Sequence, residues 1–547
     1  MSLTPKFVGF LLALLAPTLA LAAPYAVYPG CSVPSSTPAA APAGPPVTAS
    51  GNTWWIDPVY GNTPAAGGLG TQAAPWSSIQ GILQWYAPTG YPRPLLSSVP
   101  YFHYVNGVNV QVADQVGNPP VHPGDTIQLM SGNYGDVTVG SYRGPVNNSD
   151  WVRVVAAPGQ TPVFDTLSLF NSSKWIFDGI TVQSLNGTNG SENPLVKIFD
   201  QGINWPTTNI ILNNLQVSTV PAAVGEKWTQ AQWLTQARTG GIYVTGTRGP
   251  NQVGHPYTTC VAVTNSHMSY TTFGGAIMGD QLLWDSNEMD HFGDDGADYA
   301  SNSIAITRNY IHDPVNTTSG AHMDGLQGYP GVYNNVLIDS NVVIRQTYNS
   351  PLPTYLQGID AFDGDWTNMT VTNNAIITSS CWGLALWSLH NSLVADNTVV
   401  YDNHPQYLSG CGTTLAVGAV SHEGAMSSNT RVANNIAPMI WLWDEPTLST
   451  GGMSADHNVA IGPIFTGQGI TSEEDGRLGS GSDKFGNKIA TDGVAEFEGF
   501  NPATFYFNLA LSATAQAIGA GTSGAPLPIL DIKGQTRTAP FVAGAYQ

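Results

Sequence analysis

Short runs of alternating apolar and polar residues recur along most of the chain, and each run is broken by Asn, Asp or Gly. The segments 209–217, 260–268, 281–289 and 303–311 share one pattern, an aliphatic run followed by a polar corner and a second short apolar run. A period of two residues indicates β-strands, and nothing between these runs shows the spacing of an amphipathic helix. The pattern therefore predicts an all-β protein.

An asparagine marks the polar corner of each run. Its spacing is 22 or 23 residues between several neighbouring copies, so a unit of about 22 residues repeats and longer spacings contain insertions. A short strand cannot bury its apolar face alone, but coils stacked about 4.8 Å apart can, and the stacked amides would bond in a ladder. The aligned residues are Asn214, Asn265, Asn287, Asn309, Asn341, Asn374, Asn397, Asn435 and, more weakly, Asn458.

This repeat predicts the fold class. A leucine-rich repeat has a unit of similar length, but its leucine framework is absent from this chain. We therefore expect a right-handed parallel β-helix, a solenoid with coils of about 22 residues. Inward positions would be aliphatic, and outward positions would be small polar residues that tolerate close neighbours above and below.

The repeat also suggests where the parts of the chain begin and end. Residues 1–22 predict a signal peptide, with Lys6 before the apolar run 7–15 and a small-x-small pattern at Ala20 and Ala22. Residues 23–50 are rich in Pro, Ala and Ser and predict a linker. We expect a β-helix with an N-terminal cap over 51–465, a closing segment over 466–547, and a secreted or periplasmic product without a membrane anchor.

The amino-acid composition is informative mainly because it argues against some classes of partner. The 547 residues include 17 Lys and Arg against 37 Asp and Glu, and only 10% of the chain is charged. So few basic residues argue against nucleic acid as a partner, and we expect a monomer. Four cysteines allow three pairings, of which we expect Cys381 with Cys411 because they lie about one to one and a half repeats apart.

The scarce charges gather on a few neighbouring coils. A second pattern, Gly-apolar-x-apolar, begins at Gly241, Gly275, Gly296, Gly325, Gly358 and Gly383. If these glycines stack, the third positions form a column that is polar only in its middle coils. This predicted column is Tyr243, Ile277, Asp298, Gln327, Asp360 and Ala385.

Further ionisable residues fall beside that column. Asp295 and Asp324 precede the stacked glycines, and Asp294 and His322 lie close to them. The asparagine strands add Asp290, His291, His312, Asp313 and Arg345 on the same coils. Carboxylates on neighbouring coils would repel one another unless a cation joined them. Oxygen ligands of this kind suit calcium, so the predicted metal ligands are Asp294, Asp295, Asp298 and Asp324.

The flanks of the repeat carry a resemblance to a known group. The segments 54–58, 70–80 and 123–134, together with 517–521 and 531–537, resemble the first and last parts of secreted β-helix carbohydrate-active proteins. The run Asp294-Asp-Gly-Ala-Asp298 is similar to the calcium-binding run of the family 9 pectate lyases. The resemblance implies a polysaccharide lyase with calcium and a polysaccharide substrate. The chain departs from that family because no lysine lies near the acidic run to act as the base.

A uronic-acid polymer would then be cleaved by β-elimination, with His322 or Arg345 taking the C5 proton. Asp298, Asp324, His291 and His312 complete the predicted catalytic group. The predicted substrate-binding residues are Gln327, Asp360, Tyr348, Trp382, Trp387 and His390, and His267 is expected to be a core histidine.

Three alternatives stay open. An inverting glycoside hydrolase could use Asp298 and Asp360, two coils or roughly 10 Å apart, with a water between them. A C5-epimerase would use the same residues as the lyase. A non-catalytic adhesin or glycan-binding solenoid would share the asparagine ladder but would not need the charged cluster.

Overall fold

The fold is described from a computed structural model of the chain. Cys31, His322 and Cys411 lie outside the described residues, so the pairing of Cys381 with Cys411 stays a prediction, as do the signal peptide and the linker. The structure describes residues 51–547 except 64–65, 80–83, 87–91, 95–100, 106–107, 113–120, 141–145, 185–193, 201–205, 247–257, 318–322, 403–412, 419–425, 443–452, 461–463, 467–475, 478–485, 491–495 and 525.

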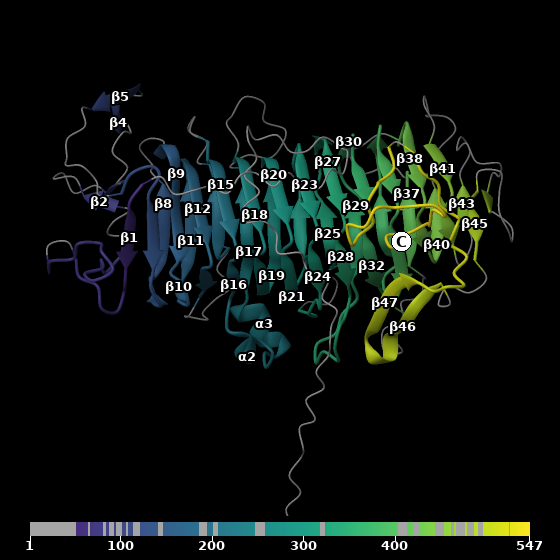
Figure 1. The fold of residues 1–547 in the computed structure, drawn as a ribbon, viewed down its shortest axis with the longest axis horizontal. Helices are drawn as coiled ribbons and strands as arrows, with labels where there is room; N and C mark the ends of the chain where they lie inside the picture. Colours follow the sequence, from purple (N-terminus) through teal and green to yellow (C-terminus); the bar gives the residue numbers. More distant parts are fainter. Residues whose placement is uncertain are drawn as a thin grey trace, which may run out of the picture.

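The chain winds into a right-handed parallel β-helix, which confirms the predicted fold class (Figure 1). Each coil contributes one strand to each of three long rows. The first row, here called the ladder face, is a sheet of 13 parallel strands. Its strands are β1 (Thr53–Ile56), β6 (Thr126–Leu129), β9 (Val146–Ala156), β12 (Ser172–Asp178), β15 (Thr208–Asn213), β18 (Thr259–Thr264), β20 (Asp280–Asp285), β23 (Ile304–Thr307), β27 (Val336–Asp339), β31 (Thr370–Thr372), β35 (Leu393–Ala395), β38 (Thr430–Ala433) and β41 (Met453–Asp456).

The second row, here called the histidine face, follows each ladder strand after a sharp corner. It shares β19 with the third row, so the two rows together make a sheet of 25 strands. Its strands are β7 (Gly132–Asn133), β10 (Pro162–Phe164), β13 (Thr181–Gln183), β16 (Gln216–Ser218), β19 (His267–Met278), β21 (Glu288–Phe292), β24 (Tyr310–His312), β28 (Val342–Ile344), β32 (Ala375–Thr378), β36 (Thr398–Tyr401), β39 (Ile436–Ala437), β42 (Val459–Ala460) and β45 (Lys488–Ile489).

The third row, here called the acidic face, completes each coil. Besides the second half of β19, it contains β8 (Asp136–Gly140), β11 (Thr166–Phe170), β14 (Val196–Phe199), β17 (Arg238–Thr245), β22 (Ala297–Tyr299), β25 (Asp324–Gly328), β29 (Gln357–Ala361), β33 (Trp382–Leu386), β37 (Thr414–Val417), β40 (Met439–Leu442), β43 (Ile464–Thr466) and the antiparallel β44 (Gly476–Arg477).

Smaller elements lie outside these rows. The helices α2 (Ala222–Gly225) and α3 (Gln230–Gln236) occupy an insertion between β16 and β17, and among the described residues no helix is long and apolar enough to cross a membrane. A short 3-10 helix, η3 (Pro502–Thr504), precedes the last strand. The remaining strands are β2 (Gln84–Tyr86) with β3 (Pro92–Pro94), β4 (Tyr101–Val105) with β5 (Val108–Val112), β26 (Val332–Asn334) with β30 (Asp365–Thr367) and β34 (Leu389–His390), and β46 (Phe497–Asn501) with β47 (Tyr506–Leu511).

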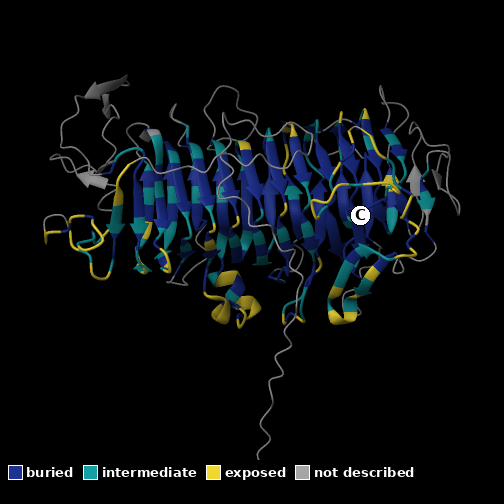
Figure 2. Cartoon of the chain, viewed as in Figure 1, coloured by how far each residue is buried: buried dark blue, intermediate teal, exposed yellow. Residues whose placement is uncertain are grey.

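The core fills the inside of the solenoid. Inward residues of successive ladder strands stack on one another, as Ile210, Val261 and Leu282 do, and each is at most 2% exposed. Figure 2 shows this burial as a continuous dark blue band along the strands. The alternation that predicted β-strands is therefore the division between core and surface.

The structure contains the predicted asparagine ladder, but two of the predicted positions, Asn214 and Asn265, are wrong by one residue. From Asn287 to Asn487 each side-chain oxygen accepts the backbone N–H of the preceding ladder residue, as Asn341 does from Asn309 at 3.0 Å. Asn214 and Asn265 lie one residue earlier, at the left-handed corner, with φ of 52° and 50°. The ladder position on those coils is held by Leu215 and Ser266.

A column of stacked glycines crosses consecutive coils of the acidic face, from Gly241 to Gly383. A Cβ added to Gly358 would lie 1.8 Å from the carbonyl oxygen of Gly383, and similar close approaches occur along the column. The structure places Gly274, not Gly275, in this column, because Gly275 pairs with Ala297. The third-position column is therefore Tyr243, Ala276, Asp298, Gln327, Asp360 and Ala385, with Ala276 in place of the predicted Ile277.

The end of the chain folds back on the corner beside the ladder. Arg537 donates to the side chain of Asn373 at 2.8 Å and to the carbonyl of Gly544 at 2.9 Å, and it lies 3.3 Å from Asp396. The N–H of Gly544 donates to the carbonyl of Asn434. The last residues therefore cover the outside of coils that precede them by more than a hundred positions.

Candidate functional site

The predicted acidic residues do meet on one face. Asp298, Gln327 and Asp360 stand opposite one another on β22, β25 and β29. Asp295 lies in the turn before β22, and its carboxylate accepts the backbone N–H of Asp324 at 2.8 Å. These side chains, with Asp294, form what we call the acidic cluster.

The acidic cluster is buried to an unusual degree for carboxylates. Asp324 and Asp360 are 0% exposed, and Asp295 and Asp298 are at most 5% exposed. Neither carboxylate oxygen of Asp360 makes a well-formed hydrogen bond among the described residues, and the same holds for Oδ1 of Asp298. The carboxylate of Asp360 makes only looser contacts, with the backbone N–H of Ala385 and the carboxylate of Asp324. Burying a charged group without a partner is costly, so such groups take up a proton or a cation.

The electrostatics of the acidic cluster agree with its burial. Burial first, and then the charge of Asp324, raise the pKa of Asp295 well above its usual range, and the same two causes act on Asp360. Burial and the neighbouring carboxylates raise the pKa of Asp298 to about 7. Tyr329 lies near the same carboxylates and is half exposed, with a pKa raised by burial to about 12.

The predicted calcium ligands therefore have the right donor chemistry, since calcium binds oxygen ligands and could neutralise these charges. However, the carboxylate oxygens of these four residues lie too far apart to bind one ion together as the structure stands. Among the described residues, three ligand atoms lie within 4.8 Å of one another only in a different group, His267, Glu288 and Asp290. Asp294, Asp295, Asp298 and Asp324 would have to move together to hold an ion.

That other group belongs to a second cluster, on the histidine face. His267 Nε2 lies 3.0 Å from Asp290, whose other oxygen lies 3.0 Å from His291 Nδ1. His312 lies between two carboxylates, 2.6 Å from Asp313 and 3.1 Å from Glu288. These residues form what we call the histidine–carboxylate cluster.

Tyrosines line the histidine–carboxylate cluster. The hydroxyl of Tyr348 lies 2.7 Å from His291 Nε2, so Asp290, His291 and Tyr348 form a chain of hydrogen bonds. The ring of Tyr270 stacks on His291, and that of Tyr310 stacks on His312 with centroids 4.0 Å apart. Tyr348, predicted to bind substrate beside the acidic cluster, is thus held on the other face.

The charges of this second cluster neutralise one another. Burial opposes the charge of His312, but its bonds to Asp313 and Glu288 outweigh burial and raise its pKa to about 9. His267 is likewise desolvated, and its bond to Asp290 raises its pKa. The pKa of Asp290 is lowered because its bonds to His267 and His291 outweigh its burial. His291 and His312, predicted to be catalytic, therefore already have partners at both ring nitrogens.

Arg345 is a structural residue in this arrangement. Its side chain is 1% exposed and its Nε donates to the carboxylate of Asp402, which is also buried. Another of its nitrogens donates to Gln346 at 2.7 Å. A base must reach the substrate, and a side chain that is buried and paired with Asp402 does not, so the structure argues against Arg345 as a base.

Three other predicted substrate-binding residues, Trp382, Trp387 and His390, lie outside the two clusters. Trp382 and Trp387 pack edge to face with each other and with Phe362. His390 lies on β34 and contacts Asp365 at 2.9 Å and Ser428 at 2.7 Å. Gln327 stands between Asp298 and Asp360 in their column, which places it inside the acidic cluster.

The sequence missed two members of the histidine–carboxylate cluster. His267 was expected inside the core, but its side chain is 31% exposed and faces outward beside Glu288. The error follows from the one-residue shift at Asn265, because a shift of one residue exchanges the two faces of a strand. Aligning Ser266 with Asn287 would have placed His267 and Glu288 side by side.

Comparisons with known proteins describe the fold further. No protein-family model and no curated protein sequence matches the chain. Among solved structures, pectate lyase Pel9A matches with 12% identity over 91% of this chain and 97% of its own, at a TM-score of 0.43. A rhamnogalacturonan lyase matches with 10% identity over 90% and 96%, at 0.32. PfbA, a surface adhesin of Streptococcus pneumoniae, matches with 12% identity over 66% and 84%, also at 0.32.

The class that the fold defines is the parallel β-helix. The similar structures include lyases and an adhesin, and their TM-scores lie below 0.5. They carry no inference about the reaction of this chain, for which its own residues must supply the argument.

Proposed function

We propose that the chain is a carbohydrate-active enzyme that cleaves a uronic-acid-containing polysaccharide by β-elimination at the acidic cluster. The observation that carries the proposal is the burial of Asp298 and Asp360 on one face with carboxylate oxygens that make no well-formed hydrogen bond among the described residues. A protein keeps such costly groups mainly where they act on a ligand. An adhesin would have no use for them.

The donor chemistry of the acidic cluster supports calcium as its ion. Asp294, Asp295, Asp298 and Asp324 would hold it, and when bound it would supply positive charge opposite the carboxylate of the sugar. Asp360 and Gln327 lie in the same column and would contact the ion or the substrate. Without an ion, the cluster would repel an acidic polymer.

Proton transfer needs a base and an acid beside the substrate. His322 remains our proposed base because the ring nitrogens of His291 and His312 already have partners and Arg345 is buried. The base takes the proton from C5, a double bond forms between C4 and C5, and the C4–O bond breaks. The leaving oxygen takes a proton from water or from Tyr329, whose half-exposed phenol lies near the cluster.

The test is to follow the near-ultraviolet absorbance of unsaturated product with alginate, pectate and bacterial exopolysaccharides, with and without a chelator. We expect activity that the chelator removes and calcium restores. Asp298→Asn should lower the rate by at least a hundredfold, whereas the control Asp165→Asn, at an exposed hydrogen bond on another coil, should not. Equal rates for the two variants would refute the proposed site.

One observation favours a second candidate, an inverting glycoside hydrolase. The pKa of Asp298, raised by burial to about 7, is suited to a general acid that protonates a leaving oxygen near neutral pH. Asp360, two coils away, would then activate water. Reducing ends that appear without near-ultraviolet absorbance would favour hydrolysis over elimination.

A further inference from the structure

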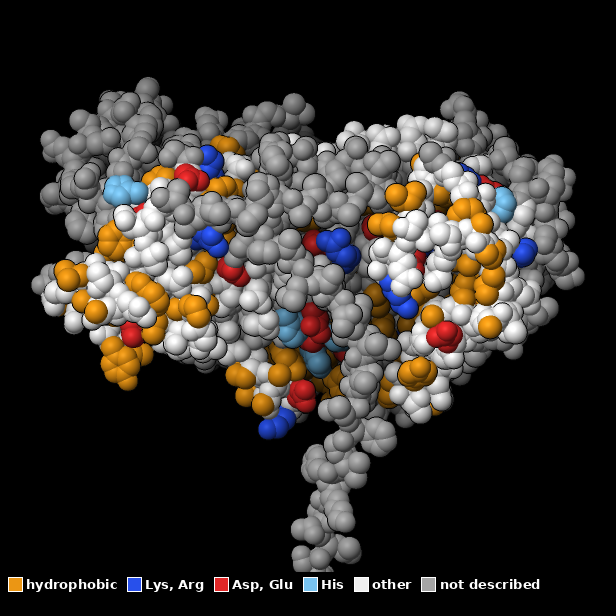
Figure 3. Space-filling view, viewed as in Figure 1, with side chains coloured by type: hydrophobic (Ala, Val, Ile, Leu, Met, Phe, Trp, Pro, Cys, Tyr) orange, Lys and Arg blue, Asp and Glu red, His pale blue; other side chains and the backbone are white. Residues whose placement is uncertain are grey.

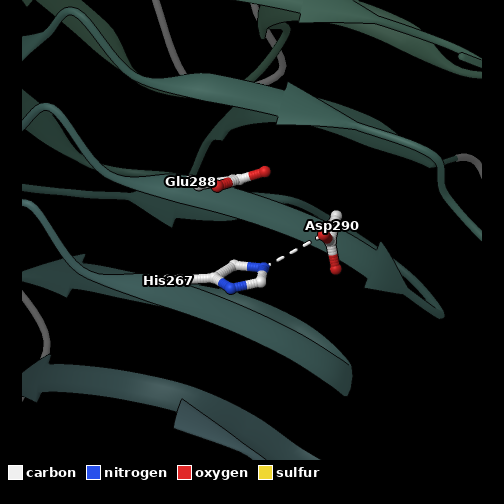
Figure 4. Close-up of side chains that lie close together, drawn as sticks. All are labelled: His267, Glu288 and Asp290. Atoms are coloured by element: carbon white, nitrogen blue, oxygen red, sulfur yellow. Dashed lines mark hydrogen bonds and ion pairs between the residues drawn. The ribbon is translucent and has the colours of Figure 1, made fainter. Parts of the chain in front are cut away.

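The histidine–carboxylate cluster contains a group of three potential ligands that the proposed reaction does not use. Figure 4 shows His267 on β19 and Glu288 and Asp290 on β21, with their polar ends converging. One ligand atom from each residue lies within 4.8 Å of the other two. Figure 3 shows histidine and acidic side chains gathered at the surface near the middle of the face drawn.

Each of these three side chains is held from outside by a different neighbour. Nδ1 of His267 lies 3.3 Å from the side-chain oxygen of Gln216, which leaves Nε2 directed into the group. A metal-bound histidine is oriented in the same way, by a hydrogen bond at its other nitrogen.

The two carboxylates are supported in the same manner. His291 Nδ1 contacts Oδ1 of Asp290 at 3.0 Å, while Oδ2 of Asp290 faces His267. His312 contacts one oxygen of Glu288 at 3.1 Å and is itself held by Asp313 at 2.6 Å. All three ligand groups therefore have an outer partner that fixes their position.

The group is open to solvent on one side. The side chains of Glu288 and His267 are 45% and 31% exposed, whereas that of Asp290 is 12% exposed. Three protein ligands with an open side are typical of metal sites that keep a position for water or another ligand. The bond between His267 Nε2 and Asp290 holds the ligands together in the absence of an ion.

We propose that His267, Glu288 and Asp290 bind a divalent transition-metal ion such as zinc. One imidazole nitrogen and two carboxylate oxygens suit zinc and its neighbours in the first transition row, whereas calcium binds oxygen alone. The ion takes the place of the proton between His267 and Asp290. This site lies on a different face from the acidic cluster and does not depend on the proposed reaction.

The experiment uses the full mature chain without a histidine tag, stripped of metal and titrated calorimetrically with zinc. We expect one saturable site per chain, which calcium does not fill. His267→Ala and Glu288→Gln should each weaken zinc binding at least tenfold. His390→Ala should bind zinc as the wild type does, because the matched pair His390–Asp365 has no second carboxylate ligand among the described residues.

Cobalt provides a second readout and guards against misfolding. Cobalt bound to the wild type should give visible absorption bands that change in Glu288→Gln, a substitution at a half-exposed side chain. Circular dichroism of the metal-free variants should match that of the wild type. No saturable zinc binding by the wild type, or unchanged binding by both His267→Ala and Glu288→Gln, would overturn the proposal.

Discussion

Replacing Asn341 by alanine tests the asparagine ladder on which the position of both clusters depends. Asn341 is 0% exposed and makes four side-chain hydrogen bonds. Its oxygen accepts the backbone N–H and the side-chain amide of Asn309, and its amide donates to the carbonyl of Ile306 and to Asn374. Alanine removes all four bonds inside a region that water does not reach.

The expected loss in the free energy of unfolding follows from the buried polar groups that the substitution leaves without partners. The N–H of Asn309 and the carbonyl of Ile306 each lose a partner, and an unsatisfied buried polar group costs about 1–3 kcal/mol. The amide of Asn309 still donates to the carbonyl of Trp284, and Oδ1 of Asn374 still accepts the backbone N–H of Asn341. We therefore expect a loss of about 2–6 kcal/mol from two such groups.

Urea unfolding followed by far-ultraviolet circular dichroism measures this loss. The matched control is Asn334→Ala on the same coil, where an exposed asparagine accepts one bond from Asn368 at 2.8 Å. We expect the control to stay within about 0.5 kcal/mol of the wild type. If Asn341→Ala matches the control, the buried ladder does not stabilise the solenoid and the reasoning is wrong.

Three further substitutions test other parts of the structure. Gly358→Ala would place a Cβ 1.8 Å from a backbone oxygen. Thermal unfolding should therefore show a much larger loss than the roughly 1–2 kcal/mol expected for Gly159→Ala, where no atom lies within 4 Å and the cost comes from the left-handed φ of +74°. Arg345→Met removes the ion-pair partner of buried Asp402 and should lower the free energy of unfolding in urea by about 3–5 kcal/mol. If Arg345 were instead exposed to solvent, the substitution would change this free energy very little. Asp360→Asn, measured in chelator, should remove part of the fall in stability with rising pH. The folded-state pKa of Asp360 is raised, so its contribution to stability is full below the ordinary value of about 3.9 and is lost as the pH rises from there through the raised folded-state pKa. An unchanged slope of stability against pH in the variant would contradict this.

The sequence predicted the fold well because its signals are local and repeated. Alternation within each strand and an asparagine in each coil were enough to identify the parallel β-helix. The errors are shifts of one residue at Asn214, Asn265 and Gly275. Adjacent similar residues, as in Asn265-Ser266 and Gly274-Gly275, fit the repeat in either register, and only stacking on the neighbouring coils decides between them.

The candidate site was less predictable because it depends on contacts between distant coils. The acidic column could be predicted, since Asp298 and Asp360 follow the strand alternation. The burial of Arg345 could not, because its partner Asp402 lies 57 positions further along the chain. Whether His267 faces the core or the solvent depends on which residue, Asn265 or Ser266, occupies the ladder position on its coil.

The two clusters meet at one corner of the solenoid but balance their charges in opposite ways. Asp290 and Asp295 are five positions apart, with the side chain of Asp290 12% exposed and Asp295 buried, yet the pKa of Asp290 is lowered and that of Asp295 is raised. Histidines account for the first shift, whereas burial and other carboxylates are the main causes of the second. The histidine–carboxylate cluster is therefore neutral enough to persist without an ion, and a metal there exchanges with a proton. The acidic cluster must gain protons or a cation to stay buried, which is why we place the binding of a charged substrate on that face.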